Sequence, residues 1–374
     1  WREGSDIASK NSDGKTALAV AVEADGWESV KVLIAMGSLL TSRDAMGDTP
    51  LHAALLWGSK KSLPLILDGG ADLGARNFAG ETALHHAVRK RDADGLASLL
   101  SRKAPLEARD NRGSTPLSVA ARSSRVDIEG RLVAAGASVE TRDVDGKTPL
   151  SIAVEAGDLD MARALVAAGG DTLAVDGMGF SPISIASTKN LALLDSLLSP
   201  LVVNKTDPTG KSALRLLIEA GTSVETAELI LAKGAVLDAR DSKASTVLHA
   251  ALRAGNLPVV TLLASAGADI YAKDADGETP ISLAITKGTE SLAALLAAPL
   301  ASSLPKMVTP PERIKGTDPL GNGLLHYAAL LGNEAAADKL LAVGVDRSLR
   351  NILGETAADI AKKRGFANLA AKLK

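Results

Sequence analysis

Short apolar stretches alternate with polar turns along the whole chain, and residues 44–76 show the pattern in full. A polar turn around Asp44 and Gly47 leads into an apolar stretch that begins at Pro50 and stops at Gly58. Proline fits the first turn of a helix, where its missing N–H costs nothing, and glycine fits the left-handed position that ends a helix. A second apolar stretch follows, so the pattern predicts two short helices joined by a turn.

This pattern repeats because its polar turn recurs at a nearly constant spacing, 33 residues over the first half of the chain. Aspartate or asparagine stands three residues before each turn glycine, where a short acceptor side chain can bond the backbone of the turn. Helices this short are marginal alone in water, so each pair is expected to stack on its neighbours as a solenoid. The turn position is occupied by Gly14, Gly47, Gly80, Gly113, Gly146, Gly179, Gly210, Ala244, Gly277, Gly321 and Gly354.

One stretch carries a known signature, T-P-L-H-x-A, which runs from Thr49 to Ala54. Looser versions stand at 82–85, 115–118, 148–151, 246–249 and 279–282. In these motifs the chain resembles the ankyrin-repeat family. The resemblance implies an all-α solenoid of stacked helix–turn–helix units with projecting β-turn or hairpin arms. It also implies binding of other proteins through the arm tips and the inner face of the first helices.

We predict a single array of eleven repeats over residues 11–374, preceded by residues 1–10 as the tail of a truncated repeat. That tail leads us to expect a fragment or processed product with more protein upstream. The predicted repeats are 11–43, 44–76, 77–109, 110–142, 143–175, 176–206, 207–240, 241–273, 274–317 with an insertion, 318–350, and 351–374 as a C-terminal cap.

Every third repeat departs from the pattern between its second helix and the next turn. Lys103-Ala104-Pro105 replaces the usual Gly-Ala-Asp, the repeat at 176–206 is short, and residues 299–317 carry the insertion. Such breaks are either drift in a tolerant loop or a device that adjusts curvature or offers a binding loop. Both alternatives stay open from the sequence.

Composition and charge remove several classes of function. The formal net charge of −2 gives no overall attraction to nucleic acid or to an acidic membrane, and no apolar run is long enough for a membrane span. The absence of cysteine excludes disulfides, thiolate nucleophiles and cysteine-ligated zinc. It fits a cytoplasmic protein or an exported, periplasmic bacterial one, and the Ala-rich array favours a bacterial origin.

The titratable residues give no sign of catalysis. Four of the five histidines (His52, His85, His249 and His326) take the fourth position of the signature, where the imidazole normally bonds the neighbouring turn. Equivalent residues of adjacent repeats should lie ~10 Å apart, too far to share a zinc ion. No nucleotide-binding or hydrolase motif is present. We therefore predict a monomeric array that is not an enzyme, has no cofactor, metal or small-molecule substrate, and binds another protein.

Basic and apolar residues mark where that partner would bind. Arg43, Arg76 and Arg109 belong to a basic ladder along the arms, which either steers an acidic protein surface or offsets the neighbouring acids. Large apolar residues on partner-facing positions are the second signal, because such side chains form interface centres. The first patch consists of Met46, Leu56, Trp57 and Phe78, and the second of Met178 and Phe180.

A third, weaker patch lies near the C-terminus, at Leu320, Leu330, Leu331, Ile352 and Leu353. For each patch the alternative is ordinary packing between repeats. Trp27 and Phe366, near the start of second helices, are predicted to face the core instead.

The sequence thus predicts a non-catalytic scaffold that binds a partner protein on its concave face. One alternative is an inhibitor or immunity-type regulatory protein that caps a specific enzyme, with the 299–317 insertion blocking a site. Another is the interaction arm of a larger multidomain protein. The sequence does not choose among these.

Overall fold

Pairs of short helices make up almost all of the regular structure. The computed structural model describes residues 6–199, 202–297, 316–318, 320–342 and 344–374, and the insertion predicted at 299–317 lies mostly outside them. By their contacts the residues divide into two units, one ending at Leu197 and one starting at Leu198. In the described part of the chain the only β pairing is two isolated bridges, so the all-α solenoid predicted from the sequence is confirmed.

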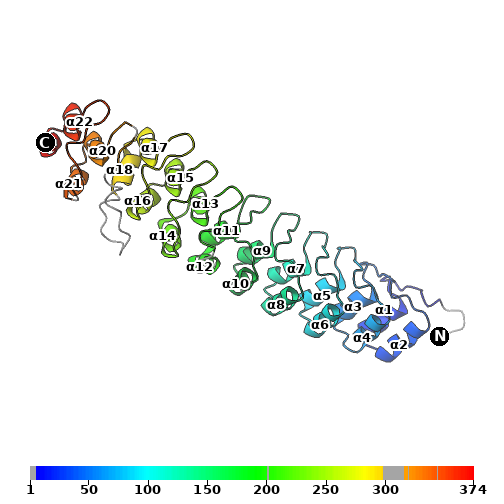
Figure 1. Ribbon diagram of the computed structural model, residues 1–374. Helices are drawn as coiled ribbons and strands as arrows, with labels where there is room; N and C mark the ends of the chain where they lie inside the picture. Colours follow the sequence, from blue (N-terminus) through cyan, green and yellow to red (C-terminus); the bar gives the residue numbers. More distant parts are fainter. Residues whose placement is uncertain (1–5, 200–201, 298–315, 319, 343) are drawn as a thin grey trace. The chain divides into compact units, whose positions relative to one another are not determined.

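Unit 1 contains six helix pairs within residues 6–197. Figure 1 shows the first helix of each pair in one row and the second helix in another, with the polar arms projecting beyond the first row. The helices are α1 (Ala17–Glu23), α2 (Trp27–Ala35), α3 (Pro50–Trp57), α4 (Ser62–Asp68), α5 (Ala83–Lys90), α6 (Ala93–Ser101), α7 (Pro116–Arg122), α8 (Val126–Ala134), α9 (Pro149–Ala156), α10 (Leu159–Ala167), α11 (Pro182–Lys189) and α12 (Leu191–Leu197).

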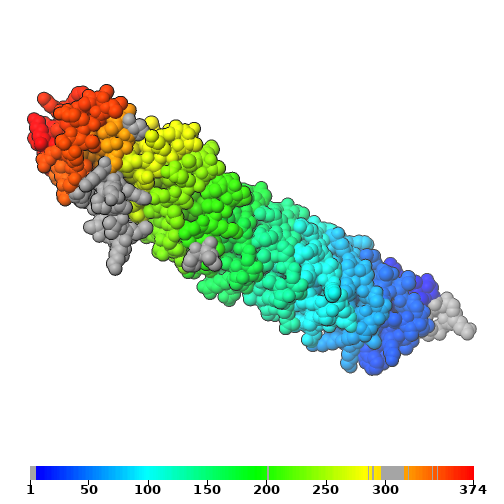
Figure 2. Space-filling model, in the orientation of Figure 1, coloured from blue at the N-terminus to red at the C-terminus, as the bar shows by residue number. Residues whose placement is uncertain are grey.

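Unit 2 repeats this arrangement in its described residues. Its helices are α13 (Ala213–Glu219), α14 (Val224–Ala232), α15 (Val247–Ala254), α16 (Leu257–Ser265), α17 (Pro280–Lys287), α18 (Thr289–Ala297), α20 (Leu324–Leu331), α21 (Glu334–Ala342), α22 (Ala357–Lys363) and α23 (Ala367–Lys372). The space-filling view in Figure 2 shows that, within each unit, successive pairs form one continuous surface in sequence order.

Leucines at one repeated position form the core of unit 1. This position lies on the first helix of each pair and is fully buried at Leu18, Leu51, Leu84, Leu117 and Leu150. Burying one such side chain stabilises the fold by about 1.5–3 kcal/mol. A single helix pair in isolation would bury too few of these side chains to fold. Stacking therefore supplies the stability that each short helix lacks.

The arms are tight turns, as the Asp/Asn–Gly spacing predicts. Asp44 N–H donates to the Asp48 carbonyl at 3.0 Å, and Gly47 N–H donates back to the Asp44 carbonyl at 3.1 Å. The Asp44 carboxylate accepts the Met46 and Asp48 N–H groups at 2.8 and 2.9 Å. Each arm also bonds the next, because Phe78 N–H donates to the Met46 carbonyl at 3.1 Å. The acidic residue of the arm is thus used to hold the turn.

Ala244 takes the arm conformation that glycine takes elsewhere, with φ of +55°. We expect Ala244→Gly to stabilise the protein by roughly 0.5 kcal/mol. Relief of left-handed strain, about 1–2 kcal/mol, exceeds the cost of about 0.5–1 kcal/mol for restricting glycine. The measurement is the urea midpoint of unfolding.

Ala251→Gly serves as the control, because Ala251 lies inside α15 with helical backbone. That variant should lose about 1 kcal/mol. A fall in the midpoint for Ala244→Gly would mean that its methyl group contributes more than its strained backbone costs.

Candidate functional site

Three large apolar side chains stand out on the surface of unit 1. Met46 and Phe78 on two adjacent arms are 68% and 69% exposed, and Trp57 at the end of α3 is 58% exposed. Leu56 beside Trp57 is half-buried. The Phe78 ring lies over Gly47, where an added Cβ would come within 2.8 Å of it. The two arms thus hold Met46 and Phe78 side by side, and we call these four residues the apolar patch.

The apolar patch interrupts a series of polar contacts between the arms and the first helices. Lys15 bonds Glu23 at 2.7 Å, and Lys147 bonds Glu155 at 2.7 Å, each pair joining an arm to the end of a first helix. Glu81 and Arg89 make the same connection at 2.9 Å. At the equivalent position α3 carries Leu56, which cannot form an ion pair.

Asp48, which would face Leu56 across this contact, turns inward instead. Its carboxylate accepts a hydrogen bond from Asn77 Nδ2 at 2.8 Å and lies 3.8 Å from His86 Nε2. Lys15 Nζ lies 6.0 Å from the centre of the Trp57 ring, close enough for a cation–π attraction of about 0.5–1 kcal/mol. Leu56 is therefore apolar where the equivalent residues Glu23, Arg89 and Glu155 are charged.

The signature histidines have the structural role that the sequence predicts. His52 Nε2 donates to the Glu81 carbonyl of the next arm at 3.0 Å, and its Nδ1 accepts the Thr49 N–H at 3.2 Å. His85, His249 and His326 make the same bridge at 3.1, 3.2 and 3.1 Å. In His52, Nε2 carries the proton because it faces a carbonyl, and Nδ1 is unprotonated because it accepts an N–H, so this ring is neutral.

His86 belongs to a buried polar cluster under the patch. Its Nε2 lies 3.4 Å from Glu81 Oε2, and its ring packs edge-on against His52 with centres 5.3 Å apart. Burial lowers the pKa of His86 to about 4 and outweighs the attraction of Asp48 and Glu81, with the neighbouring Arg89 and His52 acting in the same direction as burial. The pKa of Glu81 is also lowered, because its hydrogen bond and ion pair with Arg89 outweigh its own burial.

The basic ladder is exposed, but its donors already have partners within the chain. Arg43 Nη1 donates to the Gly47 carbonyl at 2.9 Å and to the Arg76 carbonyl. Arg76 donates in turn to the Arg109 carbonyl at 2.5 Å, and Arg109 to the Arg142 carbonyl at 2.6 Å. Each guanidinium thus links its arm to the next, a role that the sequence analysis missed. Since these acceptors are neutral, the positive charge remains.

The other two predicted patches also contain exposed residues. Met178 and Phe180 are 69% and 51% exposed, on the arm before α11. In unit 2, Leu320, Ile352 and Leu353 are exposed, and Ile352 N–H donates to the Leu320 carbonyl at 2.9 Å. Leu330 and Leu331, at the end of α20, are half-buried.

The prediction that Trp27 and Phe366 face the core is wrong, because each is 38% exposed. Trp27 is the first residue of α2, in the outermost described pair, where no earlier pair packs against it. Phe366 caps the last described helix and lies over Gly332, where an added Cβ would come within 2.6 Å of its ring. The equivalent residues of inner helix pairs, such as Val126 and Leu159, are half-buried, so this position lies at the edge of the stack rather than in its core.

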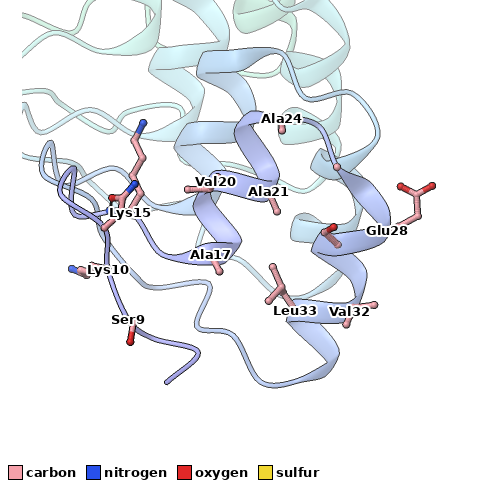
Figure 3. Close-up of a pocket in the computed structure, with 13 residues that line it drawn as sticks. Ser9, Lys10, Lys15, Ala17, Val20, Ala21, Ala24, Glu28, Val32 and Leu33 are labelled. Carbon is pink, nitrogen blue, oxygen red and sulfur yellow. Dashed lines mark hydrogen bonds between the residues drawn. The ribbon is translucent and has the colours of Figure 1, made fainter. Parts of the chain in front are cut away.

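An open hollow of about 870 Å³ lies on the outer side of α1 and α2. Figure 3 shows Ala17, Ala21 and Leu33 bordering it from the two helices. Ala21 is half-buried there, whereas its counterparts Ala54 and Ala87 in the following pairs are 1% and 0% exposed. The hollow is therefore the uncovered stacking face of the outermost described pair.

The described residues bring no group of three His, Asp or Glu side chains into a geometry suited to a metal ion. Among the helices that the structure describes, none has the length and apolar character needed to cross a bilayer.

Comparison with known proteins identifies the fold. A sequence model of a family described as ankyrin repeats, in three copies, matches residues 2–77, 65–143, 84–176 and 183–274. The chain therefore belongs to the ankyrin-repeat family. Proteins of this family generally mediate protein–protein interactions and are typically non-catalytic modules.

One solved structure that matches is the crystal structure of the ankyrin repeat domain of Bcl-3, described as a unique member of the IkappaB protein family. It is 30% identical to this chain and has a TM-score of 0.49, and the match covers 52% of this chain and 86% of that one. No curated protein matches.

Proposed function

We propose that this chain is a non-catalytic scaffold that binds a partner protein on the concave side of unit 1, between the arms and the first helices. The observation that carries the proposal is the apolar patch, where Met46, Trp57 and Phe78 are each more than half exposed. Aromatic side chains and methionine are enriched at the centres of protein interfaces. The chain has only eight aromatic residues, so the presence of two of them, Trp57 and Phe78, on adjacent repeats is a specific arrangement.

The surroundings of the patch support the same proposal. The ion pairs Lys15–Glu23 and Glu81–Arg89 border it and supply the polar rim that interface centres have. The ladder arginines Arg43, Arg76 and Arg109 would orient a partner, because their hydrogen bonds to carbonyls leave their charge uncompensated. Met178 and Phe180 would extend the contact along the arms.

Site-specific photo-crosslinking tests this placement. A photoreactive phenylalanine analogue in place of Met46 should capture a partner from an extract of the source organism, because that side chain is exposed on an arm. The same analogue at Ser101, exposed at the end of the second helix α6, serves as the control and should capture little. Equal capture from both positions would contradict the proposed placement.

A further inference from the structure

The inner surface of unit 1 changes in chemical character from one helix pair to the next. Two repeated positions show this change. The arm position lies two residues after the Asp or Asn of each arm, and the helix position lies near the end of each first helix. In the first five helix pairs the arm position is occupied in order by Asp13, Met46, Ala79, Arg112 and Asp145, and the helix position by Glu23, Leu56, Arg89, Arg122 and Glu155. The surface therefore passes from acidic to apolar, then to basic, and back to acidic.

The basic section contains a groove of about 560 Å³ directly beside the apolar patch. Its lining includes Arg89, Arg112 and Arg122, together with Ala79, whose neighbour Phe78 belongs to the patch. Arg89 is already paired with Glu81. Arg112 is exposed, and its guanidinium forms no ion pair among the described residues.

Arg122 is only loosely held, as its counterpart in unit 2 shows. Arg122 lies 3.4 Å from the Ser114 hydroxyl and 3.5 Å from the Asp143 carboxylate. Arg253 has the same two kinds of partner but lies closer to them, 2.9 Å from the Ser245 hydroxyl and 2.5 Å from the Asp274 carboxylate. The guanidinium of Arg122 can therefore donate shorter hydrogen bonds to a carboxylate of a partner.

One more cation follows Arg89, which lines the groove. Lys90 is the last residue of α5, one helix pair on from Trp57, and is exposed with no ion pair among the described residues. Beyond the groove, the exposed Asp145 and the half-buried Glu155 end the basic section. Three exposed cations, Lys90, Arg112 and Arg122, thus lie in the section of unit 1 just beyond the apolar patch, and of these only Arg122 has an ion pair among the described residues, a long one with Asp143.

We propose that the partner contributes an extended segment in which a large apolar side chain is followed or preceded by acidic residues. The apolar side chain binds at Trp57 and Phe78, and the carboxylates bind at Lys90, Arg112 and Arg122. This inference rests on the proposed function and adds the chemistry of the partner to it. Helix pairs repeat at ~10 Å and an extended chain rises ~3.3 Å per residue, so one pair corresponds to about three residues. The carboxylates therefore lie about three to six residues from the anchor.

A protein segment fits this surface better than a nucleic acid does. Glu81 and Asp110 also line the groove, and Asp145 follows on the next arm, so a continuous row of phosphates would meet carboxylates at each step. A peptide, in contrast, can carry acidic side chains at the positions that face the cations and uncharged side chains elsewhere. The acidic positions on both sides of the apolar and basic sections also limit the length of acidic segment that fits.

Selection from a random peptide library on the immobilised 374-residue chain tests the inference. The selected peptides should share a large apolar residue with Asp or Glu three to six positions away. Replacing those acids by Asn or Gln should weaken binding about tenfold, and the loss should shrink as salt rises from roughly 0.05 to 0.3 M, where screening sets in. A library without binders, or binders without this acidic pattern, would overturn the inference.

Paired variants separate this inference from the function on which it rests. R112Q/R122Q should bind the selected peptide about five- to tenfold more weakly, whereas R253Q, with the same side chain in unit 2, should bind it normally. Unchanged binding by R112Q/R122Q, or competition by a single-stranded oligonucleotide as strong as by the acidic peptide, would overturn the inference alone. Binding that is indifferent to W57A/F78A would instead overturn the proposed function.

Discussion

Replacing Trp57 and Phe78 together by alanine is expected to weaken partner binding about 100- to 1,000-fold. Buried aromatic anchors at interface centres each contribute about 2 kcal/mol or more, and 1.4 kcal/mol corresponds to a tenfold change in affinity. Thermal unfolding should change little, because both side chains are more than half exposed and their removal leaves no internal cavity. Titration calorimetry with the captured partner and a thermal melt measure the two effects.

The double variant Met178→Ala with Phe180→Ala is the matched control for this experiment. It removes two exposed apolar side chains from another arm of the same unit. We expect it to weaken binding less than tenfold, because that arm lies at the edge of the proposed contact. If Trp57→Ala with Phe78→Ala lowers the melting temperature by several degrees, the two rings belong to the packing between helix pairs and the proposed site is wrong.

The second large effect is a loss of stability in mild acid. Burial lowers the pKa of His52, His85 and His249 and brings that of His86 to about 4. In the unfolded chain a histidine takes up its proton near pH 6.5, whereas folded His86 stays neutral down to about pH 4. The unfolded state therefore binds more protons in this range, and stability falls as pH falls. At 1.36 kcal/mol per pKa unit, His86 alone accounts for roughly 3 kcal/mol.

Urea unfolding at pH 8, 6 and 4.5 measures this effect. The midpoint should hold steady above pH 6.5 and drop below it, and Glu81, whose folded pKa is lowered, adds a further loss below about pH 4.5. His86→Gln is the control, because a neutral side chain at this position removes the proton uptake and should reduce the slope. A midpoint that rises on acidification would mean that Asp48 and Glu81 stabilise a charged His86, against the burial argument.

Much of the fold is readable from local sequence because the repeat imposes the same backbone requirement many times. A residue with short acceptor oxygens and a left-handed position three residues later predicts each arm, and even Ala244 adopts the predicted conformation. Proline at the start of α3, α7 and α9 marks helix beginnings that the structure reproduces. The bridge from His52 to the next arm was also predictable, since the signature fixes that position on its helix.

The candidate site was only partly predictable, because neighbouring chain segments decide what each residue contacts. The repeat predicts that Met46, Trp57 and Phe78 lie on the surface, and all three side chains are exposed; that they face a partner stays a proposal. The sequence did not reveal that the ladder arginines bond the next arm, or that Arg122 is held more loosely than Arg253. Both depend on distances between segments about 20 to 33 residues apart.

By itself the sequence determined the repeated unit, its helices and arms, and the family, because turn geometry and helix ends depend on residues within a few positions of one another. Tertiary structure alone decided which charges are already paired, which way Asp48 turns, and how far Trp27 and Phe366 are exposed. Those outcomes depend on what the next helix pair places opposite each side chain. In a stacked array that neighbour lies one full repeat away, beyond the reach of local pattern.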